Sequence, residues 1–110
     1  MSVEVQNLVD GKRVATADGR TSELIDPTTG TAYGTAALSG TADVSAATAA
    51  AARAFETWRW TTPSERQLAM LRIADAIEAR SAELVAAESR NTGKPLALTA
   101  SEEVPPMVDQ

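Results

Sequence analysis

The 110-residue chain contains no cysteine and no histidine. Without cysteine there is no disulfide, no thiolate nucleophile and no thiolate metal ligand, and without histidine the commonest general base and metal-binding side chain is missing as well. These two absences exclude much of enzyme chemistry. The sequence therefore predicts no catalytic residue within this chain.

Positive charge and long apolar runs are also scarce. The chain has ten Lys and Arg residues and fifteen Asp and Glu residues, which gives a net charge of -5 at pH 7. Nucleic-acid binders concentrate positive charge on one face, so we expect no nucleic-acid partner. No stretch approaches the roughly 20 apolar residues of a membrane span, and residues 1–6 do not resemble a signal peptide. We expect a soluble cytoplasmic protein without a membrane partner.

The first 40 residues carry the signals of short β-strands and tight turns. Residues 5–9 and 12–16 are β-prone and are joined by Asp10-Gly11, a pair that favours the type I′ turn of a hairpin. Two further strands are expected at Thr21–Ile25 and Thr31–Leu38. They flank Asp26-Pro27-Thr28-Thr29-Gly30, where proline presets a turn that glycine completes. Residues 1–40 are therefore predicted to form β-hairpins.

A helical segment is predicted from residue 41 to residue 110. Thr41 can cap the first helix, and Asp43 suits the positive end of its dipole. The helix has an apolar stripe of mostly small residues, which predicts packing in a core or an interface rather than a ligand cage. The stripe consists of Val44, Ala47, Ala51, Ala54, Phe55 and Trp58.

A second helix is expected to begin at Thr62-Pro63-Ser64-Glu65, which combines a capping box with proline at the first helical position. It should end near Arg80, and Ser81 can cap a third helix. The apolar positions that the second helix should bury are Met70, Ile73, Ala74 and Ile77.

The third helix is predicted to stop within Glu88–Pro95. Gly93 can adopt the left-handed backbone of a helix C-terminus, and Pro95 forbids the helix to continue. Beyond it, Thr99 and Glu102 form a possible capping box, although Pro105-Pro106 can delay that helix to Val104.

Thr92-Gly93-Lys94 resembles the end of a phosphate-binding P-loop, but the spacing is wrong. The first glycine of the motif would fall on Glu88, and Pro95 stands where serine or threonine is required. We therefore predict no phosphate site here.

The order of these elements resembles the N-terminal portion of the NAD-dependent aldehyde dehydrogenase superfamily. Within it, Glu88–Asn91, Gly93–Leu96 and Glu103–Pro105 look most like aminobutyraldehyde dehydrogenases, with betaine aldehyde dehydrogenases next. The residues that carry the overall resemblance are Asn7–Lys12, Asp26–Gly30, Phe55–Trp58, Arg72–Asp75 with Ile77-Glu78, and Glu88–Pro95.

The resemblance implies an α/β fold in which these hairpins and helices form part of a Rossmann-like cofactor-binding domain. It implies an enzyme of roughly four times this length that oxidises an aldehyde through a cysteine adduct and hydride transfer to NAD. The family's catalytic and NAD-binding residues would all lie beyond Gln110, so we expect a truncated, inactive scaffold. The whole enzyme would be a homodimer or homotetramer acting on a small aldehyde, with the remainder of the chain as this segment's partner.

The resemblance also implies a cation site. Family members often hold Na⁺ or K⁺ between backbone carbonyls before the turn proline and an acidic side chain before the Gly-Lys pair. These positions correspond to Leu24, Ile25 and Asn91. Asn91 is neutral where many relatives have aspartate, so the affinity should be lower.

The alternative to a segment of an aldehyde dehydrogenase is a complete, non-catalytic α/β interaction module. A module should be monodisperse alone, whereas a segment of an enzyme should expose the apolar faces of residues 44–58 and 68–77 and self-associate.

Overall fold

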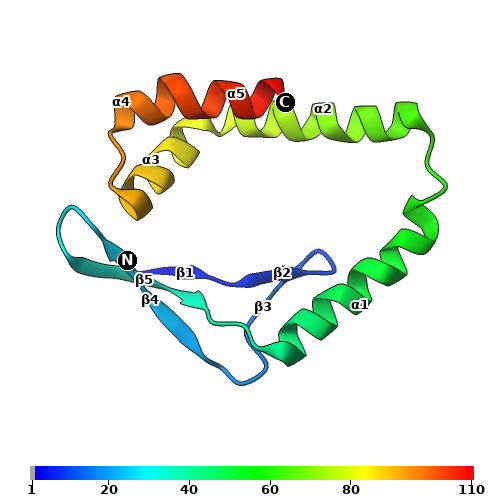
Figure 1. Cartoon of the computed structure of the whole chain (residues 1–110), viewed down its shortest axis with the longest axis horizontal. Coiled ribbons are helices and arrows are strands. Elements are labelled where there is room, and N and C mark those ends of the chain that lie inside the picture. Colours follow the sequence, from blue (N-terminus) through cyan, green and yellow to red (C-terminus); the bar gives the residue numbers. More distant parts are fainter. Residues whose placement is uncertain (1) are drawn as a thin grey trace. The chain divides into compact units, whose positions relative to one another are not determined.

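The computed structural model describes residues 2–110, which form two compact units. The first unit contains the chain up to Ile25 together with Ala32–Thr61. The second contains Asp26–Thr31 and Thr62–Gln110. Strands come first along the chain and helices follow (Figure 1), which confirms the predicted mixed α/β class.

A three-stranded sheet in the first unit consists of β1 (Val3–Val5), β5 (Thr31–Ala37) and β4 (Thr21–Asp26), with β5 in the middle. The strands predicted at residues 21–25 and 31–38 are thereby confirmed. Strand β1 was not predicted, because it pairs in parallel with β5 and no local turn joins the two. Val3 lies opposite Gly34, where a Cβ atom would collide with the Val3 carbonyl oxygen. Glycine therefore permits this close approach.

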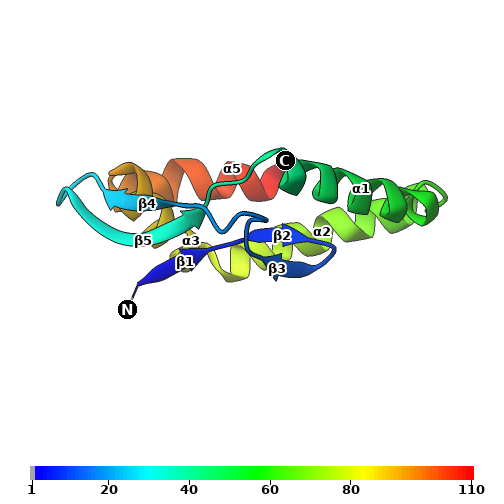
Figure 2. The same cartoon turned by 90° about the horizontal axis from the view of Figure 1, so that it is seen from below.

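The hairpin predicted around Asp10-Gly11 is present as β2 (Asn7–Val9) and β3 (Lys12–Val14), which pair antiparallel (Figure 2). Asp10 has a φ of 53° and Gly11 a φ of 72°, and two positive φ angles are what a type I′ turn requires. The strand predicted over residues 5–9 is confirmed at Asn7–Val9, but it is not continuous. Gln6 divides it, because the residues before it pair with β5 and those after it pair with β3.

Helix α1 (Thr41–Trp58) completes the first unit. Its N-cap is Gly40 rather than the predicted Thr41. The Asp43 carboxylate takes the role of a cap: its Oδ2 accepts from the Gly40 N–H at 2.8 Å and its Oδ1 from the Ala17 N–H at 2.7 Å. Asp43 therefore joins the helix start to the loop before β4. Within α1 the buried residue is Ala50, and the predicted apolar stripe is largely exposed.

Helices α2 (Pro63–Ala79) and α3 (Ser81–Thr92) belong to the second unit and begin near the predicted positions. The capping box at α2 is formed: Thr62 Oγ1 accepts from the Glu65 N–H at 3.2 Å, and Glu65 Oε2 accepts from the Thr62 N–H at 2.6 Å. The N-cap of α3 is Arg80, so Ser81 is the first helical residue instead of the cap. The predicted burial of Met70 and Ile73 is wrong, since they are 60% and 52% exposed.

The chain becomes helical again directly after Pro95, as α4 (Leu96–Leu98), the π-helical turn η1 (Thr99–Glu103) and α5 (Val104–Asp109). The predicted capping box at Thr99 is wrong: Thr99 lies inside the helical run, and its hydroxyl donates to the Pro95 carbonyl at 3.1 Å. Helix α5 does begin at Val104, as predicted. Its N–H reaches back to the Thr99 carbonyl, and this wider turn precedes the two prolines that cannot donate.

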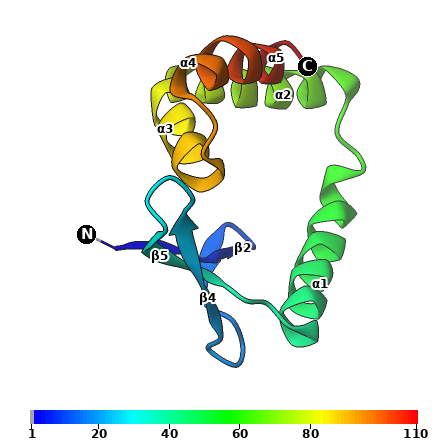
Figure 3. The same cartoon turned by 60° about the vertical axis from the view of Figure 1, so that its left-hand side comes forward.

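The run from α4 to α5 folds back so that α5 lies beside α2 (Figures 1 and 3). Among the described residues, the buried apolar side chains are Ala50, Val85 and Val104. Large apolar side chains are exposed in both units, including Val44, Trp60 and Leu71. No helix in residues 2–110 combines the length and apolarity that crossing a membrane requires.

Candidate functional site

Side chains of the last turns of α3 form hydrogen bonds with the backbone at the C-terminal end of the helix. Gly93 has a φ of 76°, and its N–H donates to the Ser89 carbonyl at 2.8 Å, as predicted for a left-handed cap. Ser89 Oγ donates to the Lys94 carbonyl at 2.7 Å. Thr92 Oγ1 donates to the Glu88 carbonyl at 2.8 Å and accepts from the Lys94 N–H at 3.2 Å. These polar groups therefore serve the helix stop.

The turn between β4 and β5 is held by Asp26. Its Oδ1 accepts from the Thr28 N–H at 2.8 Å and from the Thr28 hydroxyl at 2.6 Å, and its carbonyl accepts from the Gly30 N–H at 2.8 Å. These hydrogen bonds from Thr28 lower the pKa of the Asp26 carboxyl from its ordinary value, with a smaller contribution from the positive charge of Arg90. Asp26 thus remains ionised where it organises the turn.

The turn of residues 26–30 and the end of α3 lie against each other in the second unit (Figure 3). A Cβ atom at Gly93 would lie 3.0 Å from Pro27 Cγ and 3.9 Å from Thr28 Cγ2. The sequence identified both segments as family motifs, and the resemblance assigned Ile25 and Asn91 to one cation site, but no local signal predicted the contact between Pro27 and Gly93. Gly93 is therefore required by packing as well as by backbone conformation.

Lys94 is held by two carboxylates. Its Nζ lies 2.7 Å from Glu103 Oε1 and 3.7 Å from Glu88 Oε1. The hydrogen bond to Glu103 raises the pKa of the Lys94 amine, and Glu88 adds to this effect. A lysine flanked by two carboxylates is poorly suited to bind phosphate. Sequence reasoning missed the role of Glu103, because the π-helical turn determines where that side chain lies.

The three predicted cation ligands lie in different units. Leu24 and Ile25 are in β4 of the first unit, and Asn91 is in the last turn of α3 in the second. The Na⁺ or K⁺ site therefore stays a prediction. Within residues 2–110, no group of three or more acidic side chains is placed to hold a metal ion.

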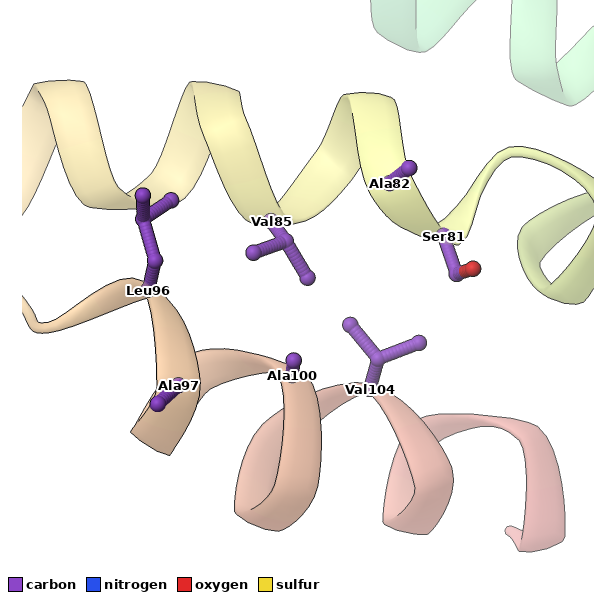
Figure 4. A pocket seen from close by; sticks show the side chains of 7 residues that line it. All are labelled: Ser81, Ala82, Val85, Leu96, Ala97, Ala100 and Val104. Carbon is purple, nitrogen blue, oxygen red and sulfur yellow. The ribbon is translucent and has the colours of Figure 1, made fainter.

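A groove of about 460 Å³ opens between α3 and the run from α4 to α5. Figure 4 shows Val85 on one wall and Val104 on the other pointing toward each other across it. The only hydroxyl-bearing residue among its lining side chains is Ser81, and none of them is ionisable. We call it the α3 groove; its lining residues are Ser81, Ala82, Val85, Leu96, Ala97, Ala100 and Val104.

Residues 14–110 match the model of the aldehyde dehydrogenase family. The chain is 40% identical over 90 residues to an aminoacetaldehyde dehydrogenase of Pseudomonas aeruginosa, covering 80% of this chain and 18% of that protein. It is 35% identical over 101 residues to a 2-aminomuconic semialdehyde dehydrogenase of Danio rerio, covering 92% of this chain and 20% of that protein.

The fold agrees with these matches. An NAD-dependent aldehyde dehydrogenase from Sinorhizobium meliloti superimposes with a TM-score of 0.85 at 38% identity, covering 93% of this chain and 21% of that structure. The chain thus spans about a fifth of the length of the proteins it matches. On the family match and the shared fold, the chain belongs to the aldehyde dehydrogenase family.

Proposed function

We propose that this chain is the N-terminal structural region of an NAD-dependent aldehyde dehydrogenase that oxidises an aldehyde to its carboxylate. The observation that supports this most strongly is the family match over residues 14–110 together with the fold shared with an NAD-dependent relative. In this proposal residues 1–110 form part of the cofactor-binding domain, and the catalytic side chains belong to the remainder of the enzyme.

The chemistry of the described residues supports a scaffold role. Asp26, Ser89 and Thr92 hold a turn and a helix end, and Lys94 is bound to carboxylates. The polar groups of these four residues are therefore occupied by hydrogen bonds and ion pairs that stabilise the fold.

The α3 groove does not fit NAD. When bound, NAD supplies the hydride acceptor, and its pyrophosphate usually lies on a glycine-rich strand-to-helix turn. The lining of the α3 groove includes neither a glycine nor a basic side chain. We therefore assign NAD binding to other parts of the enzyme.

The experiment is a spectrophotometric assay of the full-length polypeptide. We expect aldehyde-dependent NADH formation at 340 nm, and none with the 110-residue chain under the same conditions. A full-length polypeptide that oxidises no aldehyde with NAD would contradict the proposal.

For the substrate we propose an aminoaldehyde, with 4-aminobutyraldehyde preferred over betaine aldehyde. The motifs of residues 88–96 and 103–105 support this choice, as does the 40% identity to a relative named for aminoacetaldehyde. The kcat/KM for 4-aminobutyraldehyde should exceed that for betaine aldehyde, and an equal or reversed preference would refute it. The same proposal places the enzyme in the cytoplasm as a homodimer or homotetramer.

We also propose that Na⁺ or K⁺ binds through the carbonyls of Leu24 and Ile25 and the side chain of Asn91. The support is the family resemblance at these positions and the preference of hard cations for oxygen ligands. In crystals of the full-length enzyme grown in sodium or potassium salts, we expect density at oxygen-ligand distance from the Ile25 carbonyl and Asn91. Asn91→Asp should strengthen binding, and absence of the ion from both proteins would refute the site.

The competing function, a complete non-catalytic interaction module, fits the structure less well. Val44, Trp60 and Met70 are 61%, 77% and 60% exposed, and a self-sufficient module would cover more of its large apolar side chains.

A further inference from the structure

We propose that Asp10-Gly11, in the turn of the β2–β3 hairpin, is a site of spontaneous covalent modification at which Asp10 isomerises to isoaspartate. The inference concerns residues 2–20 alone and is independent of the proposed function. The chain contains a second Asp-Gly pair, Asp18-Gly19, in the loop before β4. Both pairs have the same reactive groups, so the structure around each pair determines which of them reacts.

The reaction needs only an aspartate, the next backbone nitrogen and water. The Gly11 nitrogen attacks the side-chain carboxyl carbon of Asp10, a new C–N bond closes a five-membered imide, and the amide hydrogen and the carboxyl hydroxyl leave as water. A second water then adds to the main-chain carbonyl carbon of the imide and breaks its bond to the Gly11 nitrogen, so the chain continues through the Asp10 side chain. One water is released and one is consumed. Glycine favours the attack, because it has no Cβ that shields its nitrogen.

Both reacting groups are free at Asp10-Gly11. The two residues are exposed, and within residues 2–110 neither the Asp10 carboxylate nor the Gly11 N–H has a hydrogen-bond or ion-pair partner. Strands β2 and β3 are three residues long and form a two-stranded sheet of their own. Such a hairpin is marginally stable, so local opening brings the nitrogen and the carboxyl carbon into the geometry of attack.

The same groups are held at Asp18-Gly19. The Gly19 N–H donates to the Thr16 carbonyl at 3.1 Å. Asp18 Oδ1 accepts from the Arg20 N–H at 3.1 Å, and Asp18 Oδ2 accepts from Arg20 Nε at 2.6 Å. These bonds, that of the Arg20 backbone N–H first, lower the pKa of the Asp18 carboxyl and so reduce the protonated fraction from which water leaves. The Asp18 side chain is 48% exposed, so its partners protect it and burial does not.

Isomerisation at Asp10 is incompatible with the hairpin. An isoaspartyl link adds one carbon atom to the backbone, whereas the type I′ turn requires two residues of positive φ between the paired residues Val9 and Lys12. The modification therefore breaks the pairing of β2 with β3 and distinguishes aged copies of the protein from new ones.

The test is isomer analysis of the full-length polypeptide, incubated in its folded state at neutral pH and then digested with trypsin. Cleavage after Lys12, Arg13 and Arg20 places the two sites in separate peptides. Isoaspartate is measured as a chromatographically separate isomer of unchanged mass that resists an aspartate-specific protease, whereas deamidation of Asn7 would change the mass. We expect Asp10 to isomerise at least about fivefold faster than Asp18, the factor that one net hydrogen bond provides. In urea the two rates should converge.

Three results would overturn the inference. The first is an equal or faster rate at Asp18 in the folded protein. The second is a difference in rate that is unchanged in urea, because the neighbouring sequence and not the fold would then cause it. The third comes from Asp10→Glu, which should abolish the isomer because a glutamate would have to close a less favourable six-membered imide. An isomer that persists in this variant would come from another residue.

Discussion

Gly93 lies where α3 ends and where the turn of residues 26–30 packs against the helix. Its φ of 76° falls in the region that L-residues avoid, and the Pro27 ring occupies the space that a side chain would need. Two independent costs therefore apply to any substitution. The two costs can be separated, because the chain contains other glycines with a positive φ at which an added Cβ would meet no atom within 4 Å.

Gly93→Ala should lower stability by about 2 kcal/mol or more, in part from backbone strain and in part from the displaced Pro27. Gly19→Ala is the matched control: Gly19 has a φ of 74°, but a Cβ there would meet nothing within 4 Å. Its loss should be only about 1 kcal/mol. Thermal unfolding of the two variants measures the difference, with amide exchange in the last turn of α3 as a local readout. Equal losses would mean that Pro27 adjusts freely.

Lys94 provides a pH-dependent contribution to the stability of η1. The hydrogen bond to Glu103 raises the pKa of Lys94 above its ordinary value of 10.5, so the charged form is favoured in the folded state. The contribution is complete below pH 10.5 and is lost as the pH rises through the raised value.

We expect Lys94→Met to speed amide exchange in η1 at neutral pH, and the difference from the parent to vanish at pH well above 10.5. Added salt should also reduce this difference in exchange rate, because the Lys94–Glu103 ion pair is partly exposed. Arg80→Met is the control, since it removes the exposed Arg80–Glu83 pair elsewhere in the unit and should leave η1 unchanged. A pH-independent effect on η1 would assign the contribution to the lysine stem rather than its charge.

At the scale of elements, the sequence predicted what local chemistry determines. The type I′ turn at Asp10-Gly11, the start of α2 at Thr62 and the end of α3 at Gly93 were correct because each depends on neighbouring residues. Strand β1 was missed because its partner β5 is distant along the chain. The π-helical turn was missed because local signals favoured a fresh helix start at Thr99, which instead bonds back to Pro95.

The candidate site shows the same division. The sequence located both the turn at residues 26–30 and the helix stop at residues 88–95, but only the fold brings Pro27 against Gly93 and Glu103 against Lys94. Contacts between separate elements depend on packing, which local patterns do not encode.

The capping box of α2 is the element whose contribution can be measured most directly. Thr62→Ala removes the acceptor for the Glu65 N–H and should cost about 1 kcal/mol. Ser64→Ala, in the first turn but outside the box, should cost less than half of this. The hydrogen bonds from Thr62 lower the pKa of Glu65 below its ordinary value of 4.5. The contribution of the Glu65 carboxylate is therefore present above pH 4.5 and is lost as the pH falls through the lowered value. Denaturant unfolding at pH 7 compares the stability losses of Thr62→Ala and Ser64→Ala. Equal losses would contradict the assignment of Thr62 as the N-cap.

At the scale of the whole molecule, the buried apolar residues of the described chain are few and small, while large apolar side chains remain in water. Leu68 and Leu71 on α2 are 48% and 54% exposed, and Trp58 at the end of α1 is 46% exposed. Such surfaces associate in water, because each exposed side chain gains free energy when it is covered. The 110-residue chain alone should therefore behave differently from the enzyme to which we assign it.

We expect the mean mass of the 110-residue chain, measured by light scattering, to increase with concentration, and the chain to enhance the fluorescence of an apolar dye. Leu71→Glu should reduce both effects, since it places a charge in the exposed apolar surface. Gln67→Glu adds the same charge at an exposed polar position of α2 and should change them much less. A chain that stays monomeric at every concentration and binds no dye would instead support the interaction module, because its apolar side chains would then need no further protein to cover them.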